Sequence, residues 1–168
     1  MPKLAVRGGL PLVAAMAILV APTYAVAAPP QRQILIHDEC DPNSFPVTCV
    51  RNGGVTFPHF LAQFNRLQQV PEWQFTPGQL TVGVNEPFVV TNVGGETHSF
   101  TEVAHFGGGV VPALNTFAGA TRPECTDPKN AGTFLAPGGS RTDHEDETGQ
   151  HLYQCCIHPW MHEVVTVR

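Results

Sequence analysis

The sequence has few basic residues and contains no internal repeat, heptad pattern or low-complexity tract. The missing repeats exclude a solenoid and a long coiled coil. With 168 residues the chain has room for about one domain, which excludes two independent catalytic domains. Nine lysines and arginines stand against fourteen aspartates and glutamates, so nucleic acid and anionic lipid surfaces are disfavoured as partners.

The first 28 residues have the three-part form of a secretory signal. Lys3 and Arg7 precede an apolar run, Leu10 to Val20, and small residues suited to cleavage follow it. The run is too short for an ordinary membrane-spanning helix. We therefore predict that residues 1–28 are removed, that no membrane span remains, and that the protein is periplasmic or secreted. An uncleaved membrane anchor is the alternative, which Pro22 disfavours.

Removal of the signal makes the chain more acidic. Two of the nine basic residues lie in the signal, so the exported part keeps seven against fourteen acidic residues, and its net charge is −7. This charge favours a partner protein with a basic docking patch.

The exported part divides into an N-terminal extension, residues 29–70, and a second region, residues 71–168. A short strand is predicted in the extension at residues 34–37. A helix is predicted after it, because apolar residues recur every three or four positions, at Phe57, Phe60, Leu61, Phe64, Leu67 and Val70. We expect this apolar stripe to be a packing face.

From residue 71 onward, apolar residues alternate with polar ones in short runs separated by turns. Strands are predicted at residues 73–75, 80–84, 88–92, 98–103, 149–155 and 164–168. Many short strands with little helix predict an all-β protein, an antiparallel β-sandwich.

The number of cysteines is odd. All five lie in the exported part, at Cys40, Cys49, Cys125, Cys155 and Cys156. Thiols tend to pair outside the cytoplasm. One cysteine must therefore stay free, pair between molecules or bind a metal.

Three soft or borderline metal donors lie on one predicted turn near the C-terminus. Cys155, His158 and Met161 have the spacing CxxHxxM, which brings a thiolate, an imidazole and a thioether together. Thiolate and imidazole suit copper, and a weak axial thioether is typical of blue-copper electron-transfer sites. The second histidine that such a site needs is His98, which begins a strand that would lie beside the last one. His162 is the alternative to Met161, although a strand beginning there would turn it away.

With these residues the chain resembles the cupredoxins, the type 1 copper proteins, and its loop Cys-x-x-His-Pro-x-Met is especially similar to that of the amicyanins. The resemblance covers residues 73–168. It implies a Greek-key β-sandwich, one copper ion cycling between Cu(I) and Cu(II), equatorial ligands His98, Cys155 and His158, and Met161 as the axial ligand. It also implies that the imidazole edge of His158 reaches the surface and passes electrons.

Two features depart from the family. Ser99 follows His98 where many small members have Asn, so the hydrogen bond expected across the two ligand loops must be made differently or be absent. The loop at residues 104–139 is longer than in the smallest members, and we expect it to cover or shape the face near copper. Trp160 is expected to pack at the rim of the site.

If Cys155 binds the metal, four cysteines remain for two disulfides. Cys40 and Cys49 form the natural local pair, which leaves Cys125 with Cys156, and a buried free Cys156 is the alternative. Cys155 is preferred to Cys156 as the ligand because only Cys155 has the two-residue gap to His158. Neighbours on a strand also point to opposite faces.

These residues predict a one-electron carrier that works with redox partner proteins, and not an enzyme. A second copper site would require further paired histidines, whereas we expect His105, His144 and His151 to lie on the surface. A copper carrier, chaperone or storage protein is the first alternative, although Met161 is the only methionine of the exported part and chaperone sites are usually rich in methionine. A subunit of a copper oxidoreductase is the second alternative.

Overall fold

The structure is a computed structural model that describes residues 32–45, 49–51 and 53–168. The predicted signal, residues 1–28, lies outside the described residues. Within the described part, no helix has the length and apolar character needed to cross a membrane.

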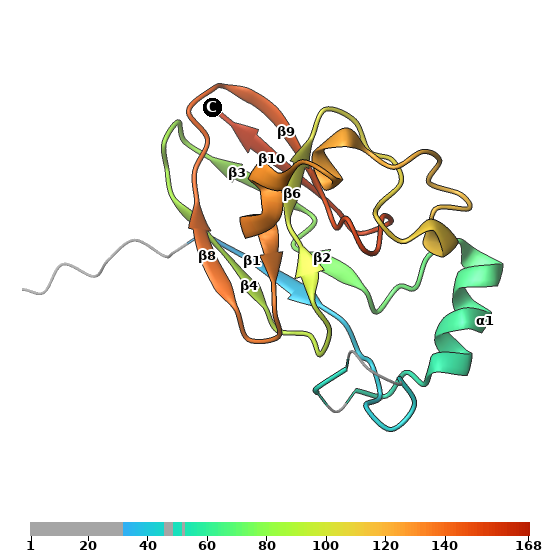
Figure 1. Cartoon of the computed structure of the whole chain (residues 1–168). Helices are drawn as coiled ribbons and strands as arrows, with labels where there is room; N and C mark the ends of the chain where they lie inside the picture. Colours follow the sequence, from blue (N-terminus) through green and yellow to red (C-terminus); the bar gives the residue numbers. More distant parts are fainter. Residues whose placement is uncertain (1–31, 46–48, 52) are drawn as a thin grey trace, which may run out of the picture.

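Two four-stranded sheets form the body of the protein (Figure 1). The first has the order β2 (Gln74–Thr76), β1 (Arg32–His37), β4 (Phe88–Asn92), β8 (Ser140–Asp143). The second has the order β3 (Gln79–Val82), β10 (His162–Val167), β9 (Gly149–Gln154), β6 (Thr101–Val103). A short antiparallel pair, β5 (His98–Ser99) and β7 (Phe134–Leu135), accompanies them.

The predicted all-β sandwich is confirmed, and most of its strand pairs are antiparallel, but each four-stranded sheet also contains one parallel pair. β1 runs parallel to β4, and β10 runs parallel to β3, while the other pairs are antiparallel. Each parallel pair joins strands that lie far apart in the sequence, so no hairpin dictates their direction. β8 has no counterpart among the predicted strands, because its four residues are polar and show no apolar alternation.

The strand predicted at residues 34–37 lies inside the first sheet. β1 pairs with β2 on one side and with β4 on the other. Its Ile34 and Ile36 are fully buried. The expected extension therefore supplies a central strand to a sheet whose other strands come after residue 71.

Aromatic rings join the two sheets. The rings of Phe100 and Tyr153 stack with centroids 4.2 Å apart, and the ring of Phe88 on β4 lies 6.4 Å from each of them. Such rings bury a large apolar area, which makes this stack a main source of the stability of the sandwich. The core gives the strands that carry the site a rigid support.

The predicted helix is α1 (Phe57–Leu67), and its ends have clear causes. The side chain of Thr56 accepts a hydrogen bond from the N–H of His59, and a proline suits the first turn. The helix ends at Gln68, which adopts a left-handed conformation with φ of 63° and donates its N–H to the carbonyl of Phe64.

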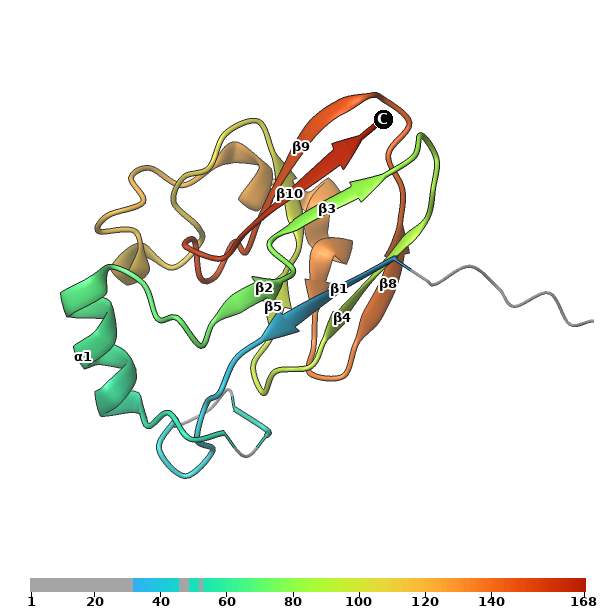
Figure 2. The same cartoon turned by 180° about the vertical axis from the view of Figure 1, so that it is seen from behind.

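α1 lies at one end of the sandwich, outside both sheets (Figures 1 and 2). The predicted packing stripe is right for Phe60, Phe64 and Val70, which are buried. It is wrong for Phe57, Leu61 and Leu67, which are 38–41% exposed, because the helix contacts the rest of the chain along a narrow face. Phe57 still packs on the ring of Phe45, and Leu67 lines a groove between the helix and the loop at residues 104–139.

Three short 3-10 helices shape the long loop at residues 104–139. They are η1 (Pro112–Leu114), η2 (Pro123–Cys125) and η3 (Pro128–Thr133). A proline opens each of them, since its fixed φ suits a first helical turn.

Candidate metal centre

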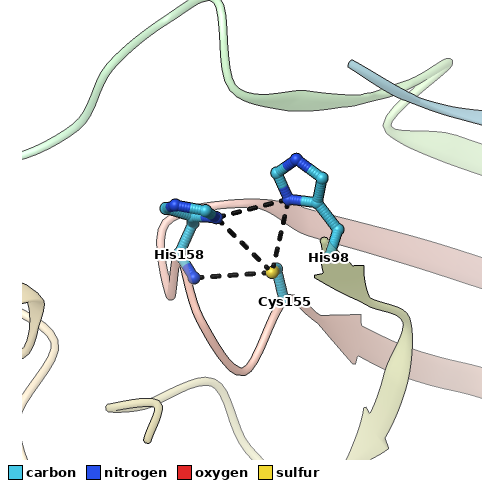
Figure 3. A group of neighbouring side chains, drawn as sticks. All are labelled: His98, Cys155 and His158. Atoms are coloured by element: carbon cyan, nitrogen blue, oxygen red, sulfur yellow. Dashed lines mark hydrogen bonds between the residues drawn. The ribbon is translucent and has the colours of Figure 1, made fainter. Parts of the chain in front are cut away.

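The three strongest predicted ligands meet at the end of the sandwich beside α1. His98 begins β5, Cys155 directly follows β9, and His158 lies in the turn that leads to β10. The Sγ of Cys155 is 3.7 Å from Nδ1 of His98 and 3.9 Å from Nδ1 of His158, and the two Nδ1 atoms are 3.3 Å apart (Figure 3). All three residues are buried.

These distances fit a metal ion at the centre of the triangle. Bonds of about 2.0 Å to nitrogen and about 2.3 Å to sulfur, in one plane, would separate the nitrogens by about 3.5 Å and each nitrogen from sulfur by about 3.8 Å. The observed separations lie within about 0.2 Å of these values. Two imidazoles and a thiolate are the donors of a trigonal type 1 copper site, so the residues present suit copper.

The surroundings of the Cys155 sulfur favour its thiolate form. It accepts hydrogen bonds from the backbone N–H of Ser99 at 3.5 Å and from that of His158 at 3.4 Å. Burial alone would raise the pKa of Cys155, but hydrogen bonds from His158 and His98 outweigh burial and lower the pKa well below its usual value. A deprotonated thiol is the form that binds metal.

Asp38 orients His98 from behind. Its carboxylate lies 2.8 Å from Nε2 of His98, which directs Nδ1 toward Cys155. The same carboxylate accepts the backbone N–H groups of Gly95 and Glu96, each at 2.9 Å. Asp38 therefore holds both the imidazole and the loop that leads to it.

The protonation of this pair follows from its contacts. Burial would lower the pKa of His98, but the hydrogen bonds to Asp38 and Cys155 raise it to about 9. Burial would raise the pKa of Asp38, but the bond from His98 and two backbone N–H groups lower it to about 2. Because a ligating imidazole must be neutral and a ligating thiol deprotonated, a bound cation would compete with a proton at Nδ1 of His98.

His158 also has a carboxylate behind it. Its Nε2 lies 3.7 Å from an oxygen of Glu96, which accepts the indole N–H of Trp73 at 2.9 Å. The loop that carries Glu96 is fixed by Asn92, whose buried side-chain amide donates to the carbonyls of Glu96 and Leu135 at 2.8 Å each.

Asp38, Asn92 and Glu96 support the candidate site, and the sequence did not indicate any of them. No spacing relates Asp38 to His98, which is 60 residues away. The only local signal of such a role is an acidic residue directly after a predicted apolar strand.

Met161 remains a predicted axial ligand. It is buried, its N–H donates to the carbonyl of His158 at 3.0 Å, and its carbonyl accepts the N–H of Cys155 at 3.1 Å. These bonds close the ligand turn and keep Met161 beside it. The alternative, His162, is exposed and stacks on Phe106 with centroids 3.8 Å apart, so it points away from the three donors.

Both predicted disulfides are present. Cys40 is bonded to Cys49, and Cys125 is bonded to Cys156. Among the described cysteines only Cys155 is free, and it is buried. The pairing leaves the predicted ligand, and not its neighbour Cys156, available for a metal.

The hydrogen bond across the ligand loops is made by Ser99. Its hydroxyl oxygen accepts the backbone N–H of Cys156 at 2.7 Å. The hydroxyl of Thr101 donates to Ser99 at 3.1 Å and also bonds to Thr133 at 2.7 Å. Serine therefore links the two loops in place of the asparagine that many small cupredoxins have.

The long loop at residues 104–139 packs against the ligand strand. Val110 donates its N–H to the carbonyl of Cys156 at 2.6 Å, and Gly107 exchanges two hydrogen bonds with the side chain of Gln154. A Cβ on Gly109 would overlap the carbonyl of Cys156, so only glycine allows this close approach. As expected, this loop shapes the site, because it bonds to and packs closely against the backbone of Cys156.

The expected surface edge of His158 is not found. His158 is 4% exposed, and its ring is surrounded by those of Phe60 at 6.4 Å, Trp73 at 6.4 Å and Trp160 at 5.5 Å. Phe60 belongs to α1, which covers the end of the sandwich where the imidazole would otherwise meet solvent. The sequence could not show this, because Phe60 precedes His158 by 98 residues.

A second group of potential metal ligands lies at the other end of β9. Nδ1 of His151 is 2.8 Å from Glu102 and 3.1 Å from Glu145, and Tyr153 donates its hydroxyl to Glu145. The expectation that His151 is an unclustered surface residue is therefore wrong, since strand pairing brings Glu102 beside it. His105 and His144 are exposed, as expected.

Neither a sequence-family profile nor a curated protein matches the chain. Solved structures do match. A purple cupredoxin from Nitrosopumilus maritimus is 18% identical, and the match spans 82% of this chain and 100% of the other with a TM-score of 0.47. A plastocyanin from Dryopteris crassirhizoma is 18% identical over 81% of this chain and 99% of its own, with a TM-score of 0.43.

An amicyanin variant is also 18% identical, over 56% of this chain and 73% of its own, with a TM-score of 0.40. These three solved proteins, a purple cupredoxin, a plastocyanin and an amicyanin, are what the chain is similar to, at low identity.

Proposed function

We propose that this protein is a type 1 copper protein that carries single electrons outside the cytoplasm. The observation that carries the proposal is the buried triangle of donors, Cys155 Sγ, His98 Nδ1 and His158 Nδ1, with two backbone N–H groups directed at the sulfur. Met161 is proposed as the weak axial ligand. Copper would supply the change between Cu(I) and Cu(II), one electron at a time.

The surrounding residues keep the donors in one arrangement. Asp38 holds His98, the Ser99 bond holds the backbone of Cys156, and α1 closes over His158. Donors that hardly move when the charge of the ion changes need little reorganisation, which makes electron transfer fast. The N–H groups that donate to Cys155 stabilise its negative charge and so tune the redox potential.

A copper carrier, chaperone or storage protein is the main alternative. Such a protein must release its ion, whereas His98 and Cys155 are fully buried and α1 covers His158. A closed site of this kind favours a permanent cofactor. For an oxidoreductase subunit, the one further cluster in the described residues offers a single imidazole with two carboxylates, unlike the paired histidines expected of a second copper site.

The proposed location is the periplasm or the exterior, and the proposed partners are redox proteins with a basic docking patch. The two disulfides favour an oxidising compartment. The net charge of −7 after signal removal would attract a basic partner and speed its association at low salt.

The test is to add Cu(II) to the purified mature protein and record visible and electron paramagnetic resonance spectra. We expect an intense thiolate-to-copper band, which Cys155→Ser abolishes. The matched control is the double variant Cys125→Ser and Cys156→Ser, which removes the neighbouring disulfide and should retain the band. A colourless, tetragonal copper complex of the unchanged protein would contradict the proposal.

A second measurement distinguishes an electron carrier from a copper carrier. The reduced, loaded protein is mixed with a one-electron acceptor and with a copper chelator, in separate experiments. A carrier of electrons should reduce the acceptor and keep its ion. Loss of the ion to the chelator without oxidation would favour the copper carrier.

A further inference from the structure

Because His158 is buried, its imidazole edge cannot be the point where electrons enter and leave the site, and another route is needed. In a solvent-exposed site the outer edge of the imidazole would meet the partner directly. Here Nε2 of His158 faces Glu96, and Glu96 is itself buried and bonded to the indole of Trp73. No external redox agent reaches the imidazole from that side.

Four rings surround the imidazole of His158 in the described structure: His98 at 4.9 Å, Trp160 at 5.5 Å, and Phe60 and Trp73 at 6.4 Å. Three of them are buried, with exposed fractions of 0% for His98, 4% for Phe60 and 1% for Trp73. Trp160 alone among these four is partly exposed. It is therefore the ring that touches both the ligand and the surface.

The outer side of Trp160 is open in two directions. One groove of about 330 Å³ lies between α1 and the long loop, with Leu67, Phe106 and Phe117 among its walls. A second groove of about 370 Å³ lies beside β2. Trp160 lines both grooves, so a redox agent that enters either one meets its indole ring.

We infer that electrons enter and leave the metal centre through the indole of Trp160, and not through the edge of His158. This inference rests on the proposed function. One electron passes from the reduced site by way of Trp160 to an external one-electron oxidant. The site loses one electron, the oxidant gains one, and no proton moves and no bond is made or broken.

The aromatic character of Trp160 is what the route requires. Tunnelling falls steeply with distance, and an aromatic ring packed at 5.5 Å from His158 bridges the gap between the imidazole and the groove. A leucine would leave a longer gap, because its side chain is shorter and has no π-electrons. A phenylalanine keeps a ring at the same place.

The experiment measures oxidation of the reduced, copper-loaded protein by a cobalt(III) complex in a stopped-flow instrument. Trp160→Leu should slow the reaction by about tenfold, which corresponds to about 1.4 kcal/mol of activation free energy. Trp160→Phe should restore most of the rate. The matched control is Val84→Ser, which changes an exposed apolar residue after β3, away from the ligand turn, and should leave the rate unchanged.

A second readout needs no copper. In the metal-free protein, acrylamide should quench the fluorescence of the Trp73→Phe variant, whose remaining indole is Trp160. It should quench the Trp160→Phe variant only weakly, because Trp73 is buried. Equal, weak quenching of both variants would show that Trp160 is not open to external molecules and would overturn the inference.

The outcomes distinguish the inference from the proposed function. If the unchanged protein forms no thiolate-to-copper band, the proposed function fails, and the inference fails with it. If the band forms in every variant and Trp160→Leu reacts as fast as the unchanged protein, the inference alone is overturned. Should Trp160→Leu fail to bind copper, the decision rests on Trp160→Phe. If this variant keeps most of the rate and Trp160 is strongly quenched, the aromatic route is supported. A tenfold loss of rate in Trp160→Phe contradicts it.

Discussion

The hydroxyl oxygen of Ser99 lies 2.7 Å from the backbone nitrogen of Cys156 and accepts its hydrogen bond. Each residue is the direct neighbour of a proposed ligand, His98 and Cys155. One short bond between neighbours thus joins two ligand segments that are 57 residues apart. We therefore expect Ser99 to influence how closely the imidazole of His98 approaches the sulfur of Cys155.

Removal of this bond should change both stability and colour. Ser99→Ala leaves the buried N–H of Cys156 without its acceptor, which should cost about 1–3 kcal/mol in the free energy of unfolding. The visible band of the copper-loaded protein should also shift. Thr101→Val is the control, since it removes a hydroxyl of the same network without touching the ligand loop. A band that shifts equally in both variants would contradict a specific role for Ser99.

Asp38→Asn should weaken copper binding by about 10–100-fold, as is usual when the partner of a ligating histidine is lost. The amide would hold Nε2 of His98 less strongly and would not favour the required tautomer. Competition with a chelator measures the affinity, and urea unfolding of the metal-free protein measures stability separately. Glu39→Gln, a neighbouring exposed carboxylate, is the control. An affinity equal to that of the unchanged protein would refute the orienting role.

Phe60→Ala should destabilise the protein by about 3–5 kcal/mol, the usual cost of deleting a buried phenylalanine. Its ring contacts Trp73, Trp160 and His158, so the loss also opens the cover of the metal centre. We expect faster removal of copper by a chelator. Leu61→Ala on the same helix is 40% exposed and should change stability by less than about 1 kcal/mol. Similar effects of the two changes would mean that α1 does not cover the site.

The two disulfides should contribute unequally. Cys125 and Cys156 are 31 residues apart, whereas Cys40 and Cys49 are 9 apart. Loop-closure entropy predicts about 3.7 kcal/mol for the longer loop and about 2.7 kcal/mol for the shorter one. Replacing each pair by serines and measuring urea unfolding tests the difference. A larger loss for the shorter loop would show that the long loop is held by its other contacts, such as the bond from Val110 to Cys156.

Stability should fall as pH rises from about 4.5 to about 7, because of Glu145. Burial, together with the charge of Glu102, raises the pKa of Glu145 from 4.5 to about 7. The unfolded chain therefore loses this proton at lower pH than the folded protein, which favours unfolding as pH rises. His151 acts in the same direction, since contacts with Glu102 outweigh burial and raise its pKa.

The check is urea unfolding at about pH 5 and about pH 7 for the unchanged protein and for Glu145→Gln. The variant should lose about 1 kcal/mol of this pH dependence, less than the full pKa shift implies because water reaches part of the group. An identical pH dependence in the variant would assign the effect to other groups.

Short-range sequence patterns predicted the ligand turn, the unpaired cysteine and most of the secondary structure of this protein. The donors Cys155 and His158 lie within one short turn, so their spacing alone indicated which atoms meet. Counting cysteines indicated that one thiol is unpaired, and the gap to His158 selected Cys155. The helix and most strands were predictable for the same reason, because periodicity and end signals act between residues a few positions apart.

Only the tertiary structure decided what surrounds the metal centre. The carboxylate of Asp38 behind His98, the cover of Phe60 over His158 and the placement of Glu102 beside His151 join residues far apart in the chain. The parallel pairing of β1 with β4 is of the same kind. Such contacts depend on how the sheets pack as a whole, and packing energy is shared among many side chains, so no short stretch of sequence encodes it.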